Sequence, residues 1–222
     1  MRKIDSEVLL QAEELYKYGL TKEMIGQAVE YVHETLDSMD SQLTTSADAR
    51  LSQLVELANL SSIVGNLFRV GVCKVSDDVF LPNKPHTYPD LLANKLKQAD
   101  ACDVEIKVAL ESNKPKGHLV KPGPHIAVRY VLANEEGDYT RGKENRGIVP
   151  YIWEVRIGEL KDEHFNVSNT EGDSGKTAVI NAAGMNELSV VYIDKDRCPV
   201  VRHPSIPKPP KAPKAPRKKR GE

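Results

Sequence analysis

The spacing of apolar residues changes near Gly71, and this change limits the fold more than any other feature of the chain. Up to about residue 70, apolar residues recur every three or four positions, which is typical of amphipathic helices. After Gly71, runs rich in Val, Ile and Tyr alternate with clusters of Gly, Pro, Asn and Asp, which is typical of strands and loops. Helices followed by strands predict an α/β (α+β) fold, with a central mixed sheet flanked by helices and a helical N-terminal segment.

Three helices are expected in the N-terminal segment. The first ends at Gly19, the second begins at Thr21, and the third is capped by Ser46 and reaches Phe68. Strands are predicted over residues 104–110, 126–133, 151–160 and 188–194, and a short helix over 91–100. We therefore predict a helical segment over residues 1–70 that packs on a core over 71–201, followed by a tail over 202–222.

The charge of the chain is unevenly distributed. The 222 residues have a net charge of −1, but residues 202–222 contain eight Lys and Arg and one acid. Residues 1–201 therefore contain 23 basic and 31 acidic side chains, with a net charge of −8. The Pro- and Lys-rich tail cannot bury apolar area and is expected to be disordered. The acidic body repels polyanions, so it would bind one only through a locally basic cleft or through bridging cations.

Several classes of protein are excluded by what the sequence lacks. No apolar run approaches the ~20 residues that a membrane span needs, so no membrane association is expected. Four acidic residues, Asp5, Glu7, Glu13 and Glu14, occupy positions where a secretory signal would be apolar, which predicts a cytoplasmic location. The three cysteines are odd in number and widely spaced, which suits neither a disulfide framework nor a zinc site.

Acidic side chains gather around one predicted strand. Asp90 ends the segment Tyr-Pro-Asp, and the segment Asp-Val-Glu-Ile-Lys begins at Asp103. Because alternate residues of a strand share a face, Asp103, Glu105 and Lys107 should project together while their neighbours point into apolar packing. Carboxylates on a buried strand are costly unless something compensates their charge. A Mg²⁺ ion would do so, because it binds hard oxygen ligands and substrate phosphates.

These residues suggest metal-assisted hydrolysis of a phosphodiester. Asp90 and Glu105 would hold the metal, and Lys107 would hold or help deprotonate the attacking water, or stabilise charge at phosphorus. The alternative is that Glu105 and Lys107 form a solvated ladder of charges on one face of the sheet.

Pro89-Asp90 together with Glu105-Ile106-Lys107 resembles the motif of the PD-(D/E)xK nuclease superfamily. The length and single domain are most similar to a type II restriction endonuclease. The resemblance implies a restriction-endonuclease-like core, Mg²⁺ as the cofactor and double-stranded DNA as the substrate. It also implies that Asp90, Glu105 and Lys107 are catalytic, and that the carbonyl of Ile106 completes the metal site. Two further acids are candidates by the same resemblance: Glu56 on an upstream helix, and Asp103.

Polar segments between the strands have the composition of DNA-contacting loops. Lysines neutralise phosphates, glycines permit close approach, and Arg and Asn are suited to reading base edges. The candidate DNA-binding residues are Lys114, Lys116, His118, Lys121, Arg141, Lys143, Asn145, Arg146 and Lys176. A flexible, solvated hairpin is the alternative for the segment 114–123.

The sequence thus predicts a Mg²⁺-dependent, site-specific endodeoxyribonuclease. A homodimer is expected, because a palindromic duplex site is matched by two-fold protein symmetry. A cognate DNA methyltransferase encoded nearby is a possible partner. Two alternatives remain: a non-catalytic DNA-binding or scaffolding protein whose basic tail contacts nucleic acid, and a structure-selective repair nuclease of the same superfamily.

Overall fold

The computed structural model describes residues 9, 12–85, 87–168, 177–201 and 203. Its helices are α1 (Ala12–Tyr16), α2 (Lys22–Ala47), α3 (Leu51–Leu54), α4 (Leu57–Val75) and α5 (Ala182–Glu187), with 3₁₀ turns at Lys143–Asn145 and Asp162–His164. Its strands are β1 (Phe80–Pro82), β2 (Leu91–Ala93), β3 (Glu105–Leu110), β4 (Lys116–Gly117), β5 (Gly123–Ala133), β6 (Val149–Leu160), β7 (Phe165–Ser168), β8 (Thr177–Ile180) and β9 (Ser189–Ile193).

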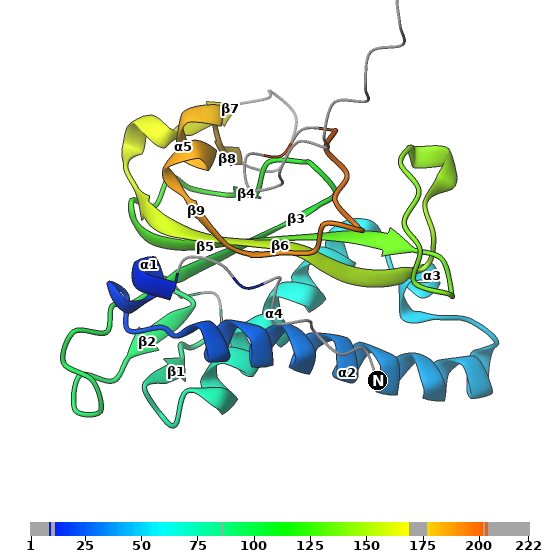
Figure 1. Ribbon diagram of the computed structural model, residues 1–222, viewed down its shortest axis with the longest axis horizontal. Helices are drawn as coiled ribbons and strands as arrows, with labels where there is room; N and C mark the ends of the chain where they lie inside the picture. The colour runs from blue at the N-terminus through cyan, green and yellow to red at the C-terminus, as the bar shows by residue number, and fades with distance from the viewer. Residues whose placement is uncertain (1–8, 10–11, 86, 169–176, 202, 204–222) are drawn as a thin grey trace, which may run out of the picture.

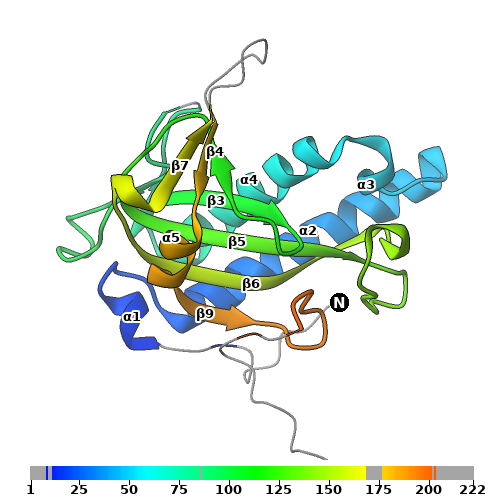
Figure 2. The same ribbon diagram turned by 90° about the horizontal axis from the view of Figure 1, so that it is seen from above.

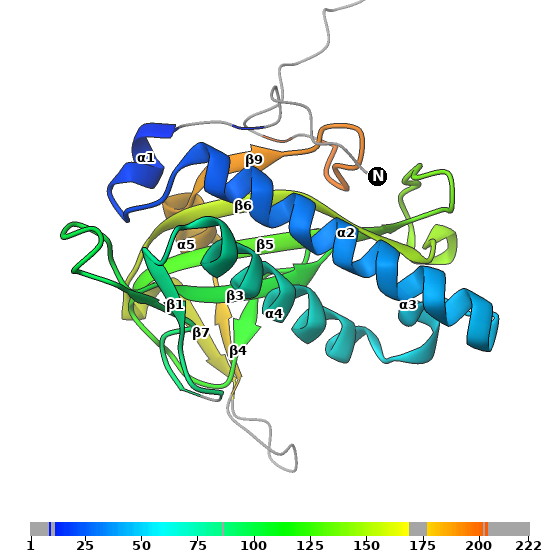
Figure 3. The same cartoon turned by 90° about the horizontal axis from the view of Figure 1, so that it is seen from below.

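A four-stranded sheet in the order β3-β5-β6-β9 forms the middle layer (Figure 1). Helices α2 and α4 cover one face of this sheet, as Figure 3 shows from below. The other face carries a smaller sheet, in the order β4-β8-β7, together with the short helix α5 (Figure 2). The predicted mixed α+β class is confirmed, although helices α2 and α4 lie on one face and a second sheet covers much of the other.

The central sheet is mixed because β3 runs parallel to β5, whereas β5–β6 and β6–β9 are antiparallel. Parallel neighbours need a crossover connection, which is usually a helix. Here the crossover is the segment 111–122, and its regular structure is the two-residue strand β4. The crossover segment therefore returns across the sheet face that α2 and α4 leave free.

The two faces of β3 differ as the sequence predicts. Val104 and Ile106 are buried in the same apolar cluster as Val29 of α2 and Phe68 of α4. Because side chains alternate along a strand, Glu105 and its second neighbour Lys107 project to the opposite face.

The second predicted helix is confirmed, and the third is wrong. The side chain of Thr21 accepts a hydrogen bond from the Met24 amide at 3.2 Å, which caps α2 at its N-terminus. Ser46 lies in the last turn of α2, where its hydroxyl donates a hydrogen bond to the Gln42 carbonyl at 2.9 Å, and it is not the N-cap of a following helix. The expected third helix is divided into α3 and α4 by extended backbone at Val55 and Glu56. The buried apolar residues of the expected third helix, among them Leu60, Val64 and Phe68, therefore all lie on α4.

The short helix expected over residues 91–100 is also wrong. Leu91 exchanges two backbone hydrogen bonds of 3.0 Å with Val104, and β2 pairs with β1. Turns follow β2 up to Asp100. Pairing with distant strands thus overrides the local preference of this segment.

The boundaries of the packed body differ from those predicted. Helix α4 continues to Val75, beyond the expected end of the helical segment at residue 70. At the other end, His203 is 6 % exposed and hydrogen-bonded to Glu154, so the packed body reaches beyond residue 201. The rest of the predicted tail lies outside the described residues. Among the helices of the described part of the chain, none combines the length and the apolar character needed to cross a membrane.

Candidate active site

Asp90 lies beside Glu105 because of the way β2 meets β3. The bridge between Leu91 and Val104 is antiparallel, so the preceding residue of one segment faces the following residue of the other. The Asp90 carboxylate also accepts a hydrogen bond from the Ile106 amide at 2.8 Å. The sheet edge therefore brings together the two carboxylates that the sequence singles out.

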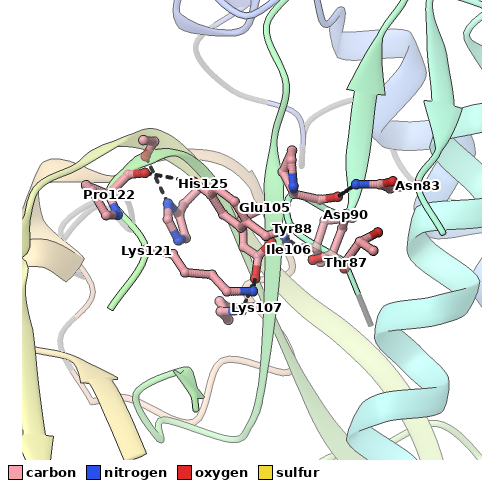
Figure 4. A network of polar contacts seen from close by, with 12 residues as sticks. Asn83, Thr87, Tyr88, Asp90, Glu105, Ile106, Lys107, Lys121, Pro122 and His125 are labelled. Carbon is pink, nitrogen blue, oxygen red and sulfur yellow. Dashed lines mark hydrogen bonds and ion pairs between the residues drawn. The ribbon is translucent and has the colours of Figure 1, made fainter. Parts of the chain in front are cut away.

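The two carboxylate oxygens of Glu105 have different surroundings: one is hydrogen-bonded, and the other has no partner among the described residues. Its side chain is 2 % exposed, and its Oε1 accepts hydrogen bonds from the ammonium groups of Lys107 and Lys121, the latter at 3.0 Å (Figure 4). Its Oε2 is buried and has no hydrogen-bond partner among the described residues. A buried carboxylate oxygen without a partner is costly, so it marks a position suited to a bound cation or donor.

The pKa values of the two carboxyl groups are shifted in opposite directions. Burial raises the pKa of Asp90, and the charge of Glu105 adds to this effect, against the hydrogen bond from Ile106. Burial also opposes ionisation of Glu105, but the charges and hydrogen bonds of Lys107 and Lys121 outweigh it, so the pKa of Glu105 is lowered. Ionisation is therefore favoured at Glu105 and disfavoured at Asp90. A bound cation would stabilise the ionised form of Asp90.

The oxygen ligands present fit Mg²⁺ better than a transition metal. In the described part of the chain, no group of three or more His, Cys, Asp or Glu side chains is placed to hold an ion. Mg²⁺ does not require such a cage, because it is commonly bound by one or two carboxylates with waters and substrate phosphates in the remaining positions. The free Oε2 of Glu105 and the neighbouring Asp90 supply this minimal set.

The crossover segment 111–122 covers Lys107. A Cβ atom added to Gly117 would lie 3.0 Å from Cε of Lys107, so β4 approaches this lysine closely. The side chain of Lys107 is accordingly only 13 % exposed. The ladder of charges is therefore enclosed and not solvated, which argues against the alternative of a solvated ladder.

The end of the crossover segment is tied to the Pro-Asp turn. The Tyr88 hydroxyl donates a hydrogen bond to the Pro122 carbonyl at 2.7 Å, and Nζ of Lys121 lies 4.8 Å from the centroid of the Tyr88 ring. Gly123 has a φ of 125°, and a Cβ atom there would lie 3.1 Å from the Tyr88 hydroxyl. Glycine is thus required where the turn and the crossover segment meet.

The predicted DNA-binding residues lie in two separate places. Lys114, Lys116 and His118 are exposed on the crossover segment, which also carries Lys121. The loop 134–148 lies beyond the far end of β5, about 25 Å from the Glu105 end of the sheet at the usual rise per residue.

The loop 134–148 is held by contacts of its own. Arg146 forms an ion pair with Glu111 at 2.8 Å, and Arg141 donates to the Val200 carbonyl at 3.0 Å. Asn145 donates to the Arg141 carbonyl at 2.8 Å, whereas Lys143 is exposed. Lys176 lies outside the described residues. The structure therefore does not bring this loop to the carboxylates.

Neither additional acid considered from the sequence joins the pair. Asp103 is exposed and accepts a hydrogen bond from the Ala93 amide at 2.8 Å. Glu56 is exposed at the N-terminal end of α4. The residue of α4 that does reach the site is Arg69, whose charge partly offsets the effect of burial on the pKa of Asp90. Arg69 is 13 residues from Glu56, or about 20 Å along a helix.

Arg69 and His125 are site residues that the sequence analysis missed. His125 is paired in register with Glu105, is completely buried, and has an Nε2 without a partner among the described residues. Burial lowers the pKa of His125 and so favours its neutral ring. Only the parallel pairing of β3 with β5, which local sequence patterns do not encode, could have revealed it.

The arrangement can therefore bind a hard divalent cation next to a lysine ammonium. Lys107 lies on the same face as Glu105, where it can donate to a water or a phosphate oxygen. Neither the protein-family models nor the curated proteins compared with this chain give a match.

Proposed function

We propose that this protein is a Mg²⁺-dependent endodeoxyribonuclease that hydrolyses phosphodiester bonds of double-stranded DNA at a specific sequence, like a type II restriction endonuclease. The observation that supports this best is the meeting of Asp90 with Glu105, whose Oε2 is buried and free while its Oε1 is paired with Lys107. A purely structural ion pair would have its oxygens satisfied.

Each residue has a chemical role in the proposed reaction. Asp90 and Glu105, with the carbonyl of Ile106, would hold the cation. When bound, Mg²⁺ supplies a more acidic water and stabilises the negative charge that develops at phosphorus. Lys107 orients the attacking water by donating a hydrogen bond, and its positive charge stabilises the transition state. The enclosure of Lys107 strengthens this effect because bulk water screens it less.

The charge of the body gives a reason for the metal requirement. Residues 1–201 carry a net charge of −8, which repels a DNA backbone. The lysines of the crossover segment provide a local basic surface at the site, and a divalent cation would remove the remaining repulsion between the carboxylates and a phosphate. We therefore expect DNA to bind poorly in EDTA.

Three further parts of the proposal concern context. A palindromic site would be cut by a homodimer. The enzyme would act in the cytoplasm, where DNA is accessible. A DNA methyltransferase encoded nearby would protect the host sequence, and its presence would favour restriction over repair.

Cleavage of supercoiled plasmids in Mg²⁺ tests the proposal. We expect discrete linear fragments from the wild-type protein and none in EDTA. Asp90→Asn and Lys107→Met should lower the cleavage rate by about 10³-fold or more. Lys195→Met is the control for the loss of one positive charge, because Lys195 is exposed and follows β9, at the opposite edge of the central sheet from β3. Plasmids that stay intact across many sequence contexts would contradict the proposal.

The same assay separates the alternatives. Preferential cutting of branched or damaged duplexes would identify a repair nuclease. Binding that needs no divalent metal, falls steeply with salt and is lost when residues 204–222 are deleted would identify a non-catalytic DNA-binding protein.

A further inference from the structure

Lys121 holds an unusual position in the candidate active site. Its Nζ lies 3.0 Å from Oε1 of Glu105, the same oxygen that pairs with Lys107. The side chain of Lys121 is 28 % exposed, compared with 13 % for Lys107 and 2 % for Glu105. Lys121 is thus the outermost member of the group and lies between Glu105 and solvent.

The balance of charge does not allow all of these groups to stay in place around a cation. The two negative charges of Asp90 and Glu105 are matched in number by the positive charges of Lys107 and Lys121, both of which pair with Glu105. Adding a divalent cation without any other change would leave a net charge of +2 in an enclosed site, with Arg69 nearby. Unbalanced charge in a poorly solvated place is strongly unfavourable, so one ammonium group has to move.

Lys121 is the ammonium group that can move. Lys107 is confined by β4, since a Cβ atom on Gly117 would lie 3.0 Å from its Cε. The backbone next to Lys121 is fixed through Pro122, whose carbonyl accepts the Tyr88 hydroxyl at 2.7 Å. A change of side-chain rotamer alone therefore carries the Lys121 ammonium from Glu105 toward solvent.

We propose that Lys121 is a displaceable counter-ion of Glu105, which leaves when the divalent cation binds and then contacts a DNA phosphate. This inference rests on the proposed cation site at Asp90 and Glu105. Lys121 acts as a positioning residue: it keeps the Glu105 carboxylate in place before the metal arrives and couples metal binding to DNA binding. By linkage, DNA that captures the released ammonium also favours the metal-bound state.

Calorimetric titration with Mn²⁺ tests the exchange without any readout of cleavage. Lys121→Met removes the competitor of the cation, so Mn²⁺ should bind about tenfold more tightly than to the wild type, as expected for one partly exposed charged hydrogen bond. Lys121→Arg keeps the charge and should bind within about twofold of the wild type. Lys84→Met is the control for a lost positive charge on the turn that carries Asp90, and it too should bind within about twofold.

A second measurement uses the wild-type protein only and does not depend on the variant's folding. With lysine labelled at Nζ with ¹⁵N, the Lys121 signal should be observable before Mg²⁺ is added, because the ion pair slows proton exchange. It should broaden or shift as Mg²⁺ binds, while the Lys107 signal remains. A Lys121 signal that Mg²⁺ leaves unchanged, or equal Mn²⁺ affinity in Lys121→Met and the wild type, would overturn the inference.

The results also distinguish this inference from the proposed function. If the wild type binds Mn²⁺ and cuts plasmids but Lys121→Met shows no gain in affinity, only the role of Lys121 fails. If neither protein binds Mn²⁺, the cation site fails together with the exchange.

Discussion

Two clusters of charged residues share the sheet face opposite α2 and α4, and they differ in how well their carboxylates are satisfied. In the first, Oε2 of Glu105 has no partner among the described residues, and burial raises the pKa of Asp90. In the second, both oxygens of Glu154 are paired: Oε1 with Arg156 at 2.8 Å and with His203 at 2.6 Å, and Oε2 with Arg129.

The registers of the sheet show how close the clusters are. Lys107 is paired with Ala127 of β5, and Ala127 is paired with Arg156 of β6. Each cluster contains a buried glutamate between cations. Burial of charge therefore does not by itself indicate a functional site. The difference is the free oxygen and the raised pKa at the Asp90 end, where a ligand would improve the electrostatics.

The largest expected effect concerns cleavage. Replacing Lys107 by Met should lower the rate of plasmid cleavage by about 10³-fold, because it removes a charge that stabilises the transition state. Asp90→Asn and Glu105→Gln should lower it at least as much. The double variant Asp90→Asn/Glu105→Gln should cleave no more slowly than the slower of its two single variants, since the two carboxylates act on one cation. Single-turnover rates measure this, and losses that multiply would show that the residues act separately.

The second prediction concerns Glu154, the glutamate whose two carboxylate oxygens are both paired. Glu154→Gln should destabilise the fold by about 3–5 kcal/mol, because it leaves Arg129 and Arg156 buried without a counter-charge. Urea unfolding followed by circular dichroism measures the loss. A change below about 1 kcal/mol would mean that Glu154 is not the centre of this cluster.

The third prediction is the pH dependence of the stability that ionised Glu154 contributes to the fold. Burial opposes ionisation of Glu154, but its hydrogen bonds and charges from His203, Arg156 and Arg129 lower its pKa from 4.5 to about 2. Because the pKa is lower in the folded state, the stabilisation is present above pH 4.5 and is lost as the pH falls toward about 2. It amounts to about 3 kcal/mol, since one pKa unit corresponds to 1.36 kcal/mol.

The control for this prediction is the variant without the carboxylate. Urea midpoints of the wild type and Glu154→Gln should converge between pH 5 and pH 2.5, whereas other carboxyl groups affect both proteins alike. A constant difference across this range would contradict the assignment.

The smallest expected effect is a gain in stability at the other cluster. Asp90→Asn keeps an acceptor for the Ile106 amide but removes a charge that burial disfavours. Because the pKa of Asp90 is raised in the folded state, its charge costs stability at neutral pH and the cost disappears in acid. Without metal, the variant should therefore melt slightly higher than the wild type at pH 7 but not at pH 3. A lower melting temperature at pH 7 would show that the Asp90 charge is already compensated.

Part of this account could be predicted from the sequence. Two predictable features depend only on local sequence patterns. One is the alternation along β3, which places Glu105 and Lys107 on the face opposite Ile106, and the other is the capping of α2 by Thr21. The contacts made by Lys121, His125 and Arg69 depend instead on the parallel crossover and on how α4 packs, which local patterns do not encode. The expected helix over 91–100 was wrong for the same reason, since the pairing of Leu91 with Val104 decides that segment.

The loop 134–148 shows the same limit for function. Its Arg and Asn residues have the composition of a DNA-reading element, but Arg146 is paired with Glu111 and Arg141 with the Val200 carbonyl. The composition of the loop suggested DNA binding. The partners of its side chains and its distance from Glu105 are set by the folded chain and could not be predicted from composition.

The most direct test of the central claim is the effect of Mg²⁺ on unfolding of the wild type and Asp90→Asn. If Asp90 and Glu105 share a cation, Mg²⁺ at about 100 times its dissociation constant should stabilise the wild type by about 2.7 kcal/mol. The same Mg²⁺ concentration should leave Asp90→Asn almost unchanged, and EDTA should reverse the gain. Equal stabilisation of both proteins, or of neither, would contradict the account.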